Sequence, residues 1–138
     1  MHARPLYLAA VLLASVAAST CADAKPVKSP PKSSAPSGDA VAGGQIFKTT
    51  CSVCHGQQAE GTALAPPLRG VVGAKAATSP FPRYTPALKA SGLVWSAAKL
   101  NVFLSGPAKL VPGTAMPISI PKADDRKNVI AFLATLKR

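Results

Sequence analysis

The chain has 138 residues, a length that allows one domain, and 48% of its residues are hydrophobic. Its 16 Lys and Arg residues outweigh 5 Asp and Glu residues, which gives a formal net charge of +11. Such a basic balance favours negatively charged partners. A nucleic-acid partner is not expected, because the arginines are not clustered with aromatic residues and the N-terminus predicts export.

The N-terminal region predicts a targeting segment. Arg4 precedes an almost unbroken apolar run, Leu6 to Ala18, and Ala22-Asp23-Ala24 offers a cleavage site of the A-x-A type. The apolar run is shorter than the roughly 20 residues that a membrane-spanning helix needs. We therefore expect residues 1–24 to be a cleaved signal peptide and the mature protein to be periplasmic. Cleavage removes Arg4 and Asp23 together, so the net charge stays at +11.

An alternative interpretation of this region concerns Cys21, which follows Ala18-Ser19-Thr20 in a position that resembles a bacterial lipoprotein site. Under this interpretation the protein is lipid-anchored through Cys21. Threonine directly before the cysteine departs from the usual small-residue preference. If the chain is instead cleaved after Ala24, Cys21 is lost and the mature chain keeps two thiols, both of which belong to the motif described below.

Residues 25–38 predict a solvated, semi-extended linker. The segment is rich in proline, serine and lysine and offers almost nothing to bury. A tether and a spare N-terminus of the mature protein are both compatible with this composition. The folded domain is then expected over residues 39–138, roughly 100 residues, which is small enough for a buried cofactor to matter for its stability.

A first helix is predicted over Ala40 to Thr50, with Asp39 as its N-cap. One face of this helix has four members: Gly43, Ile46, Phe47 and Thr50. A glycine four residues before a phenylalanine indicates that another backbone element comes close to the helix at this point.

The residues that follow, Cys51-Ser52-Val53-Cys54-His55, form a C-x-x-C-H motif, which is typical of c-type haem attachment. Thiols three positions apart lie on one edge of a tight turn, where each can add across a vinyl group of the same porphyrin. The histidine is then held under the ring centre, where a neutral imidazole nitrogen can ligate iron. A thioredoxin-like redox pair would need a βαβ context. A structural zinc site would need four ligands, and beyond the motif the chain has only Cys21 and His2.

Two helices are predicted in the middle of the domain. Thr85-Pro86 supplies the N-cap and first residue of a two-turn helix that Gly92 ends. Ser96 caps a helix that ends at Gly106-Pro107 and whose apolar residues are Leu100, Phe103 and Leu104. Pro112 to Pro121 holds three prolines and predicts irregular structure.

The last helix is the clearest prediction. Asp124 and Asp125 favour its start, and Lys137 and Arg138 favour its end. Its apolar stripe has i, i+3, i+4, i+7 spacing and comprises Val129, Phe132, Leu133 and Leu136. No segment alternates as a strand, so the predicted fold is all-α, with about four to five short helices around one covalently attached haem.

The side of the iron opposite His55 decides the function, because an open position permits binding of small molecules and a filled one favours electron transfer. The mature chain has a single methionine, Met116, in the proline-bracketed segment Val111 to Pro117. A lone methionine is commonly core filler, but this one lies in a constrained loop rather than on an apolar stripe. Lysines and Tyr84 would have to lose a proton before they could ligate. Met116 is therefore the expected sixth ligand.

Residues 39–138 as a whole resemble class I cytochromes c, the small monohaem electron carriers of respiratory chains, here in an exported bacterial form. The motif lies near the start of the domain, unlike in the four-helix-bundle cytochromes c′. The resemblance implies that Gly43 and Phe47 of the first helix pack across Phe132 and Val129 of the last.

The resemblance also implies roles for residues around the haem. The carbonyl of Pro66 would accept the ring proton of His55 and so orient this ligand. Tyr84 and Trp95 are similar to the family's hydrogen-bond donors to a buried propionate. Thr114 belongs to the same loop as the predicted sixth ligand.

The chain departs from the family pattern at two places near the haem. Phe103 stands where many members have a tyrosine, so a hydroxyl is missing. Ala74, followed by Lys75, stands where many members have an arginine. Lys109 and Lys122 match loosely the lysines that often ring the exposed haem edge in this family.

The function expected from these residues is one-electron transfer in which both axial ligands are kept and no protein residue is catalytic. Thioether ligation and burial both favour the reduced iron. The expected partners are acidic-faced redox proteins or a membrane oxidase or reductase, with no small-molecule substrate, and the chain is expected to be a monomer.

One alternative function is that of a dedicated haem c subunit of a periplasmic dehydrogenase or oxidase complex. Another is a haem sensor or peroxidase-like enzyme, which needs the open iron site that Met116 would fill.

Overall fold

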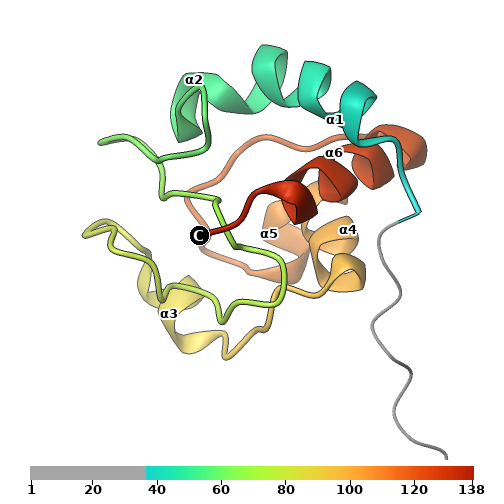
Figure 1. Cartoon of the computed structure of the whole chain (residues 1–138). Helices are drawn as coiled ribbons and strands as arrows, with labels where there is room; N and C mark the ends of the chain where they lie inside the picture. Colours follow the sequence, from blue (N-terminus) through green and yellow to red (C-terminus); the bar gives the residue numbers. More distant parts are fainter. Residues whose placement is uncertain (1–36) are drawn as a thin grey trace, which may run out of the picture. The chain divides into compact units, whose positions relative to one another are not determined.

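The computed structural model describes residues 37–138. The predicted signal peptide (1–24), Cys21 and most of the predicted linker (25–38) lie outside the described residues. The described part is helical (Figure 1), and its segments in chain order are α1 (Ala40–Ile46), the π-helical segment η1 (Phe47–Cys51), α2 (Ser52–His55), α3 (Pro86–Ala90), α4 (Ala97–Ser105), α5 (Pro107–Leu110) and α6 (Ala123–Thr135). Extended pairing in these residues is limited to one bridge between Lys75 and Val94, so the all-α prediction is confirmed. Over the same range, no helix has the length and apolar character required to cross a bilayer.

The first helical run is longer than the sequence predicts. The Asp39 carboxylate caps it as expected, by accepting a hydrogen bond from the backbone N–H of Val41 at 2.8 Å. The run then continues past Thr50 through η1 and α2 to His55, so the haem-attachment motif is itself helical. It ends at Gly56, whose φ of 83° lies in the left-handed region that glycine adopts most readily.

α1 and α6 cross with their backbones in close contact (Figure 1). A Cβ atom at Gly43 would clash with the backbone carbonyl of Asn128 on α6, so only glycine allows the helices to come this close. One turn further along, the ring centres of Phe47 and Phe132 lie 5.2 Å apart. Phe47 and Val129 are the largest fully buried side chains of the described residues. The predicted packing of the first helix on the last is confirmed.

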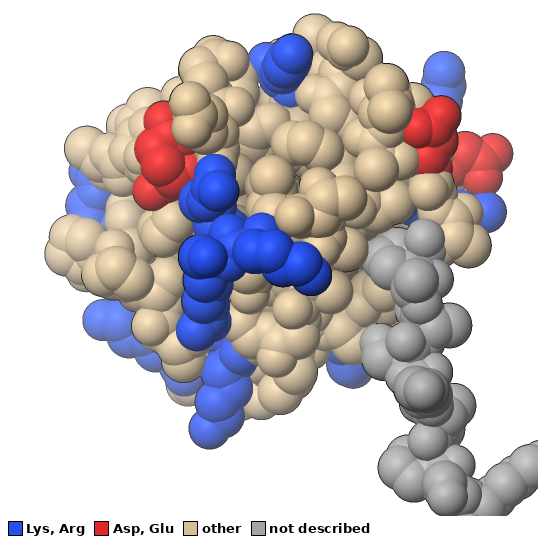
Figure 2. All heavy atoms as spheres, viewed as in Figure 1, with Lys and Arg blue, Asp and Glu red and all other residues tan. Residues whose placement is uncertain are grey.

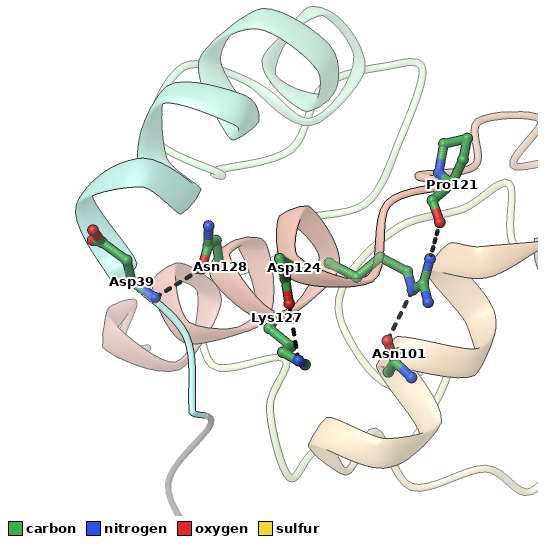
Figure 3. Close-up of polar contacts among 7 residues, drawn as sticks. Asp39, Asn101, Pro121, Asp124, Lys127 and Asn128 are labelled. Carbon is green, nitrogen blue, oxygen red and sulfur yellow. Dashed lines mark hydrogen bonds and ion pairs between the residues drawn. The ribbon is translucent and has the colours of Figure 1, made fainter.

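Polar contacts fasten α6 to its neighbours (Figure 3). The backbone N–H of Asp39, just before α1, donates to Asn128 Oδ1 at 2.8 Å. Arg126, also on α6, donates to Asn101 Oδ1 on α4 at 2.8 Å and to the carbonyl of Pro121 at 2.6 Å. These bonds satisfy backbone groups at a helix start and in a loop, and they fix α6 against both α1 and α4.

Both predicted N-caps in the middle of the chain are confirmed. The hydroxyl of Thr85 accepts a hydrogen bond from the backbone N–H of Leu88 at 3.2 Å. The hydroxyl of Ser96 accepts one from Lys99, also at 3.2 Å. α4 buries the expected apolar residues, which are Leu100, Phe103 and Leu104. α5 was not predicted, because a proline that follows one helix can also be the first residue of the next. It begins at Pro107, with only Gly106 between it and the end of α4.

The end of the last helix differs from the prediction. α6 stops at Thr135, and Leu136, predicted as the last member of its apolar stripe, has an extended backbone. The Leu136 carbonyl accepts a hydrogen bond from the backbone N–H of Gly70 at 2.7 Å. This bond connects the end of the chain to a loop that is distant in the sequence. Leu136 still packs against the core. The predicted helix is therefore too long at its C-terminal end, whereas the apolar contact predicted for Leu136 is confirmed.

Replacing Gly43 by alanine should lower the free energy of unfolding by about 1–3 kcal/mol, because the added Cβ clashes with the Asn128 carbonyl. The loss is expected even though alanine is the better helix former. Chemical denaturation of the haem-loaded protein measures the change. Gly44→Ala is the matched control, since its Cβ would meet only the ring edge of Phe132 at 3.3 Å. Equal stability of the two variants would contradict the role of the crossing.

Candidate haem site

A cavity of about 510 Å³ lies among the first helical run, the loops that follow it and α4. This volume falls within the range of about 300–1,000 Å³ that is typical of ligand and cofactor sites. Every residue that the sequence predicts at the haem lines the cavity, namely Cys51, Cys54, His55, Pro66, Tyr84, Trp95, Thr114 and Met116. The fold thus brings distant parts of the sequence to one place.

Cys51 and Cys54 are free, half-buried thiols in the cavity lining. Because residues three apart share one face of a helix, both sulfur atoms can meet the same bound molecule. Burial, and to a smaller extent the neighbouring Cys54, raises the pKa of Cys51 to about 11. Cys51 therefore keeps its proton at neutral pH.

His55 is the last residue of α2 and is buried, with 9% of its surface exposed. Its Nδ1 atom lies 2.7 Å from the carbonyl oxygen of Pro66. Because a carbonyl can only accept, Nδ1 donates the hydrogen and Nε2 keeps a free electron pair. Burial lowers the pKa of His55, and the hydrogen bond to Pro66 opposes this only in part. The ring is thus neutral, oriented and in a tautomer that suits a metal ligand.

The loop after the motif places Pro66 beside the histidine. The backbone N–H of Gly61 donates to the His55 carbonyl at 2.8 Å. The hydroxyl of Thr62 donates to the Cys54 carbonyl at 2.6 Å. Carbonyls at a helix end have no partner within the helix, and these bonds satisfy them. The same bonds fold the loop back over α2, which brings the Pro66 carbonyl to the imidazole.

Met116 reaches the cavity from a loop without regular structure, as predicted. Gly113, with φ of 87°, lies in a tight turn in which the N–H of Thr114 donates to the Val111 carbonyl at 3.0 Å. The hydroxyl of Thr114 then accepts a hydrogen bond from the backbone N–H of Met116 at 3.4 Å. Thr114 therefore positions the backbone of Met116, whose side chain is half-buried.

Tyr84 and Trp95 both line the cavity. The hydroxyl of Tyr84 is hydrogen-bonded to that of Ser79. The backbone N–H of Trp95 donates to the Ala74 carbonyl at 2.9 Å, which places the indole beside the cavity. The Trp95 and Phe103 rings pack with their centres 4.9 Å apart. Phe103, which stands where the resemblance implied a tyrosine, thus makes an apolar contact with Trp95.

The cavity lining also contains four positive charges, of which only Lys75 was expected near the haem. They are Arg69, Lys75, Arg83 and Arg138, and no Asp or Glu of the described residues lines the cavity. Figure 2 shows Lys and Arg side chains gathered on one face near the C-terminal end of the chain, with acidic side chains towards its edges. The three arginines come from separate stretches of sequence, so no local pattern indicated them. Positive charge fits a group that bears carboxylates, as haem does.

Two thiols, a neutral imidazole and a thioether therefore meet at one largely apolar cavity. This donor set fits covalent haem attachment and iron ligation, and it defines a c-type haem protein.

Comparisons with known proteins agree with this class. The family model for cytochrome c matches residues 40–137. The chain is 43% identical over 107 residues to cytochrome c of Tetrahymena pyriformis, covering 77% of this chain and 96% of that protein. It is 44% identical over 102 residues to cytochrome c2 of Rhodomicrobium vannielii, covering 71% and 79% respectively. The solved structure of cytochrome cH from Methylobacterium extorquens has a TM-score of 0.66 at 41% identity, over 71% of this chain and 99% of that one.

The chain belongs to the cytochrome c family. It is a class I cytochrome c, as its sequence predicts, with one covalently attached haem c and a C-x-x-C-H motif that includes Cys51 and Cys54. Its function is that of an electron carrier that exchanges electrons with redox partners. The alternative of a dedicated subunit of a larger complex is not favoured by these relatives.

Proposed function

We propose that the thiols of Cys51 and Cys54 form the two thioether bonds to the haem. His55 and Met116 are then the axial ligands of its iron. The convergence of these side chains on one cavity carries the proposal. A bound haem supplies an iron that alternates between the ferric and ferrous states. The chain would thus pass one electron at a time.

The two groups assigned to the iron, the His55 imidazole and the Met116 thioether, are neutral. Two neutral ligands support electron transfer rather than catalysis. A neutral imidazole, a thioether and apolar walls all disfavour the extra positive charge of ferric iron. If both His55 and Met116 hold the iron, they would leave it no open position for a small molecule. The proposal therefore assigns no catalytic residue and no small-molecule substrate to the chain, and it does not favour a sensor or peroxidase.

Four further residues are assigned supporting roles in this proposal. Tyr84 and Trp95 would donate hydrogen bonds to a haem carboxylate, which is supported by their places in the cavity lining. Thr114 would keep Met116 in position through the hydrogen bond to its backbone N–H. Lys75, which also lines the cavity, would supply a positive charge beside Ala74.

The proposal includes export of a monomer to the bacterial periplasm. Residues 1–24 are assigned as a signal peptide, residues 25–38 as a linker and residues 39–138 as the cytochrome domain. The apolar run and its cleavage site support this division, and so does similarity to a cytochrome c2. A lipid anchor at Cys21 is the alternative for membrane attachment.

The partner is proposed to be an acidic-faced redox protein or a membrane oxidase or reductase. Lys109 and Lys122 are exposed and flank the loop that contains Met116. Two exposed apolar side chains, Leu64 (65% exposed) and Ile118 (42% exposed), also line the cavity. An apolar rim with nearby lysines is suited to brief docking against a negatively charged surface.

Covalent attachment predicts that the haem stays with the protein when the mature wild type is denatured and extracted with acidified organic solvent. A thioether bond is not broken by this treatment, whereas iron ligation is. The absorbance of the two phases measures the partition of the haem. The variant with both Cys51→Ala and Cys54→Ala is the control and should release any haem that it binds. Release of haem from the wild type would refute attachment through these thiols.

Ligation by Met116 predicts a weak near-infrared absorption band, from sulfur to ferric iron, in the oxidised wild type at neutral pH. The band should be absent in Met116→Ala, because this is the only methionine of the mature chain. Thr114→Ser is the matched control, since it changes the same loop but keeps both the sulfur and the hydroxyl. Identical near-infrared spectra of wild type and Met116→Ala would assign the sixth position to another group.

Docking through lysines predicts that electron transfer to an acidic partner slows by about tenfold or more between low and moderate salt. The screening length shortens to about 10 Å at 0.1 M salt, which weakens a steered encounter. Stopped-flow kinetics measure the second-order rate. Lys109→Glu or Lys122→Glu should slow transfer further, whereas Lys89→Glu on α3 makes the same change in net charge and should matter less. A rate that does not depend on salt would argue for an apolar interface.

A further inference from the structure

Ser52, the first residue between the two cysteines, is polar but buried, with 4% of its surface exposed. Its hydroxyl donates a hydrogen bond to the Lys48 carbonyl at 2.7 Å. The same oxygen accepts a hydrogen bond from Gln57 Nε2 at 3.2 Å. Lys48 precedes the attachment motif and Gln57 follows it, so one hydroxyl links both ends of the motif. Ser52 is not among the residues of the described chain that line the haem cavity.

The Ser52 hydroxyl acts at the point where the helix changes its hydrogen-bond register. In an α-helix the N–H of Ser52 would bond to the carbonyl of Lys48, four residues earlier. Here it bonds to the carbonyl of Phe47, five residues earlier, which is the π-helical pattern. The hydroxyl of Ser52 takes the Lys48 carbonyl instead. In an α-helix the Lys48 carbonyl would accept a hydrogen bond from the backbone N–H of Ser52. The Ser52 hydroxyl replaces that bond and so stabilises the π-turn.

The π-turn determines where Cys51 points, because the helix is held on both sides of it. On one side Phe47 is fixed in the core against Phe132 of α6. On the other side α2 is fixed by the loop, through hydrogen bonds to the carbonyls of Cys54 and His55. A change of one residue in register rotates a helical segment by about 100°. Since the segments on both sides are fixed, a change of register would rotate Cys51, which lies between them, and so change the direction of its side chain.

We propose that Ser52 is a positioning residue for thioether formation at Cys51; this rests on the attachment through Cys51 and Cys54 proposed above. In that step the thiol S–H adds across a vinyl C=C bond, so that sulfur bonds to one carbon and the hydrogen goes to the other. The addition needs no oxidant or reductant. Ser52 makes and breaks no bond in it. Its hydroxyl keeps the Cys51 sulfur in reach of the vinyl group, whereas Cys54 is placed by α2 and its loop.

The test compares proteins matured in cells that attach haem: wild type, Ser52→Ala, Ser52→Thr and Val53→Ala. Val53→Ala is the matched control, because Val53 also lies between the cysteines but is 73% exposed. Alkylation of free thiols followed by peptide mass spectrometry reports on Cys51 and Cys54 separately. The absorption spectrum in alkaline pyridine independently shows whether one vinyl group is still unreacted.

Ser52→Ala is expected to accumulate protein whose haem is attached through Cys54 alone. Free Cys51 should rise about fivefold over wild type, the ratio that corresponds to loss of one net hydrogen bond. Val53→Ala should match the wild type, and Ser52→Thr, which keeps a hydroxyl, should restore most of the attachment at Cys51. A general folding defect would instead lower attachment at both cysteines alike.

Complete attachment at both cysteines in Ser52→Ala would overturn the proposal. Equal loss at Cys51 and Cys54 in both Ser52 variants would also overturn it. Haem that can be extracted from the wild type would instead refute the underlying attachment, so the two failures are distinguishable.

Discussion

The crossing of α1 and α6 at Gly43 is the contact on which the rest of the structure depends. Because a side chain at this position would clash with the Asn128 carbonyl, the two backbones touch, and no larger residue could keep them together. The same contact brings Phe47 into the core beside Val129. From this anchor the helical run continues unbroken to His55, so the position of the crossing determines where the haem-attachment motif meets the cavity.

The C-terminal end of the motif is held by hydrogen bonds to the last carbonyls of the helix, which every helix must satisfy. The last carbonyls of a helix lack partners within it, and leaving them unpaired in a buried place costs about 1–3 kcal/mol each. Gly61 and Thr62 supply those partners, at the carbonyls of His55 and Cys54. In doing so they set the path of the loop that places the Pro66 carbonyl on the imidazole. The orientation of the His55 ring thus follows from ordinary helix termination.

Most of the fold could be predicted because its signals are local. Helix caps, the attachment motif and the close approach at Gly43 each depend on residues a few positions apart, and the structure has all of them. η1 was not predicted, because its register depends on the burial of Phe47 and on the Ser52 hydroxyl, neither of which is a helix-breaking signal. The exit of Leu136 from α6 was missed because its partner, Gly70, lies far away in the sequence.

The candidate site shows the same division between local and distant causes. Motif and loop composition were enough to single out the thiols, the imidazole and Met116 as candidates, and all four residues line the cavity. The arginines of the cavity lining are scattered in the sequence and were visible only after folding. The arrangement of the positive charges meets two requirements of a basic electron carrier, which are to keep positive charge near the iron and to limit its desolvation. Positive charge next to the iron would favour the reduced state, but it would also have to be desolvated. Cations at the cavity can face the haem carboxylates and be compensated there. Lys109 and Lys122 are exposed and stay in water, where in the proposed function they would attract an acidic partner at long range without a large desolvation cost.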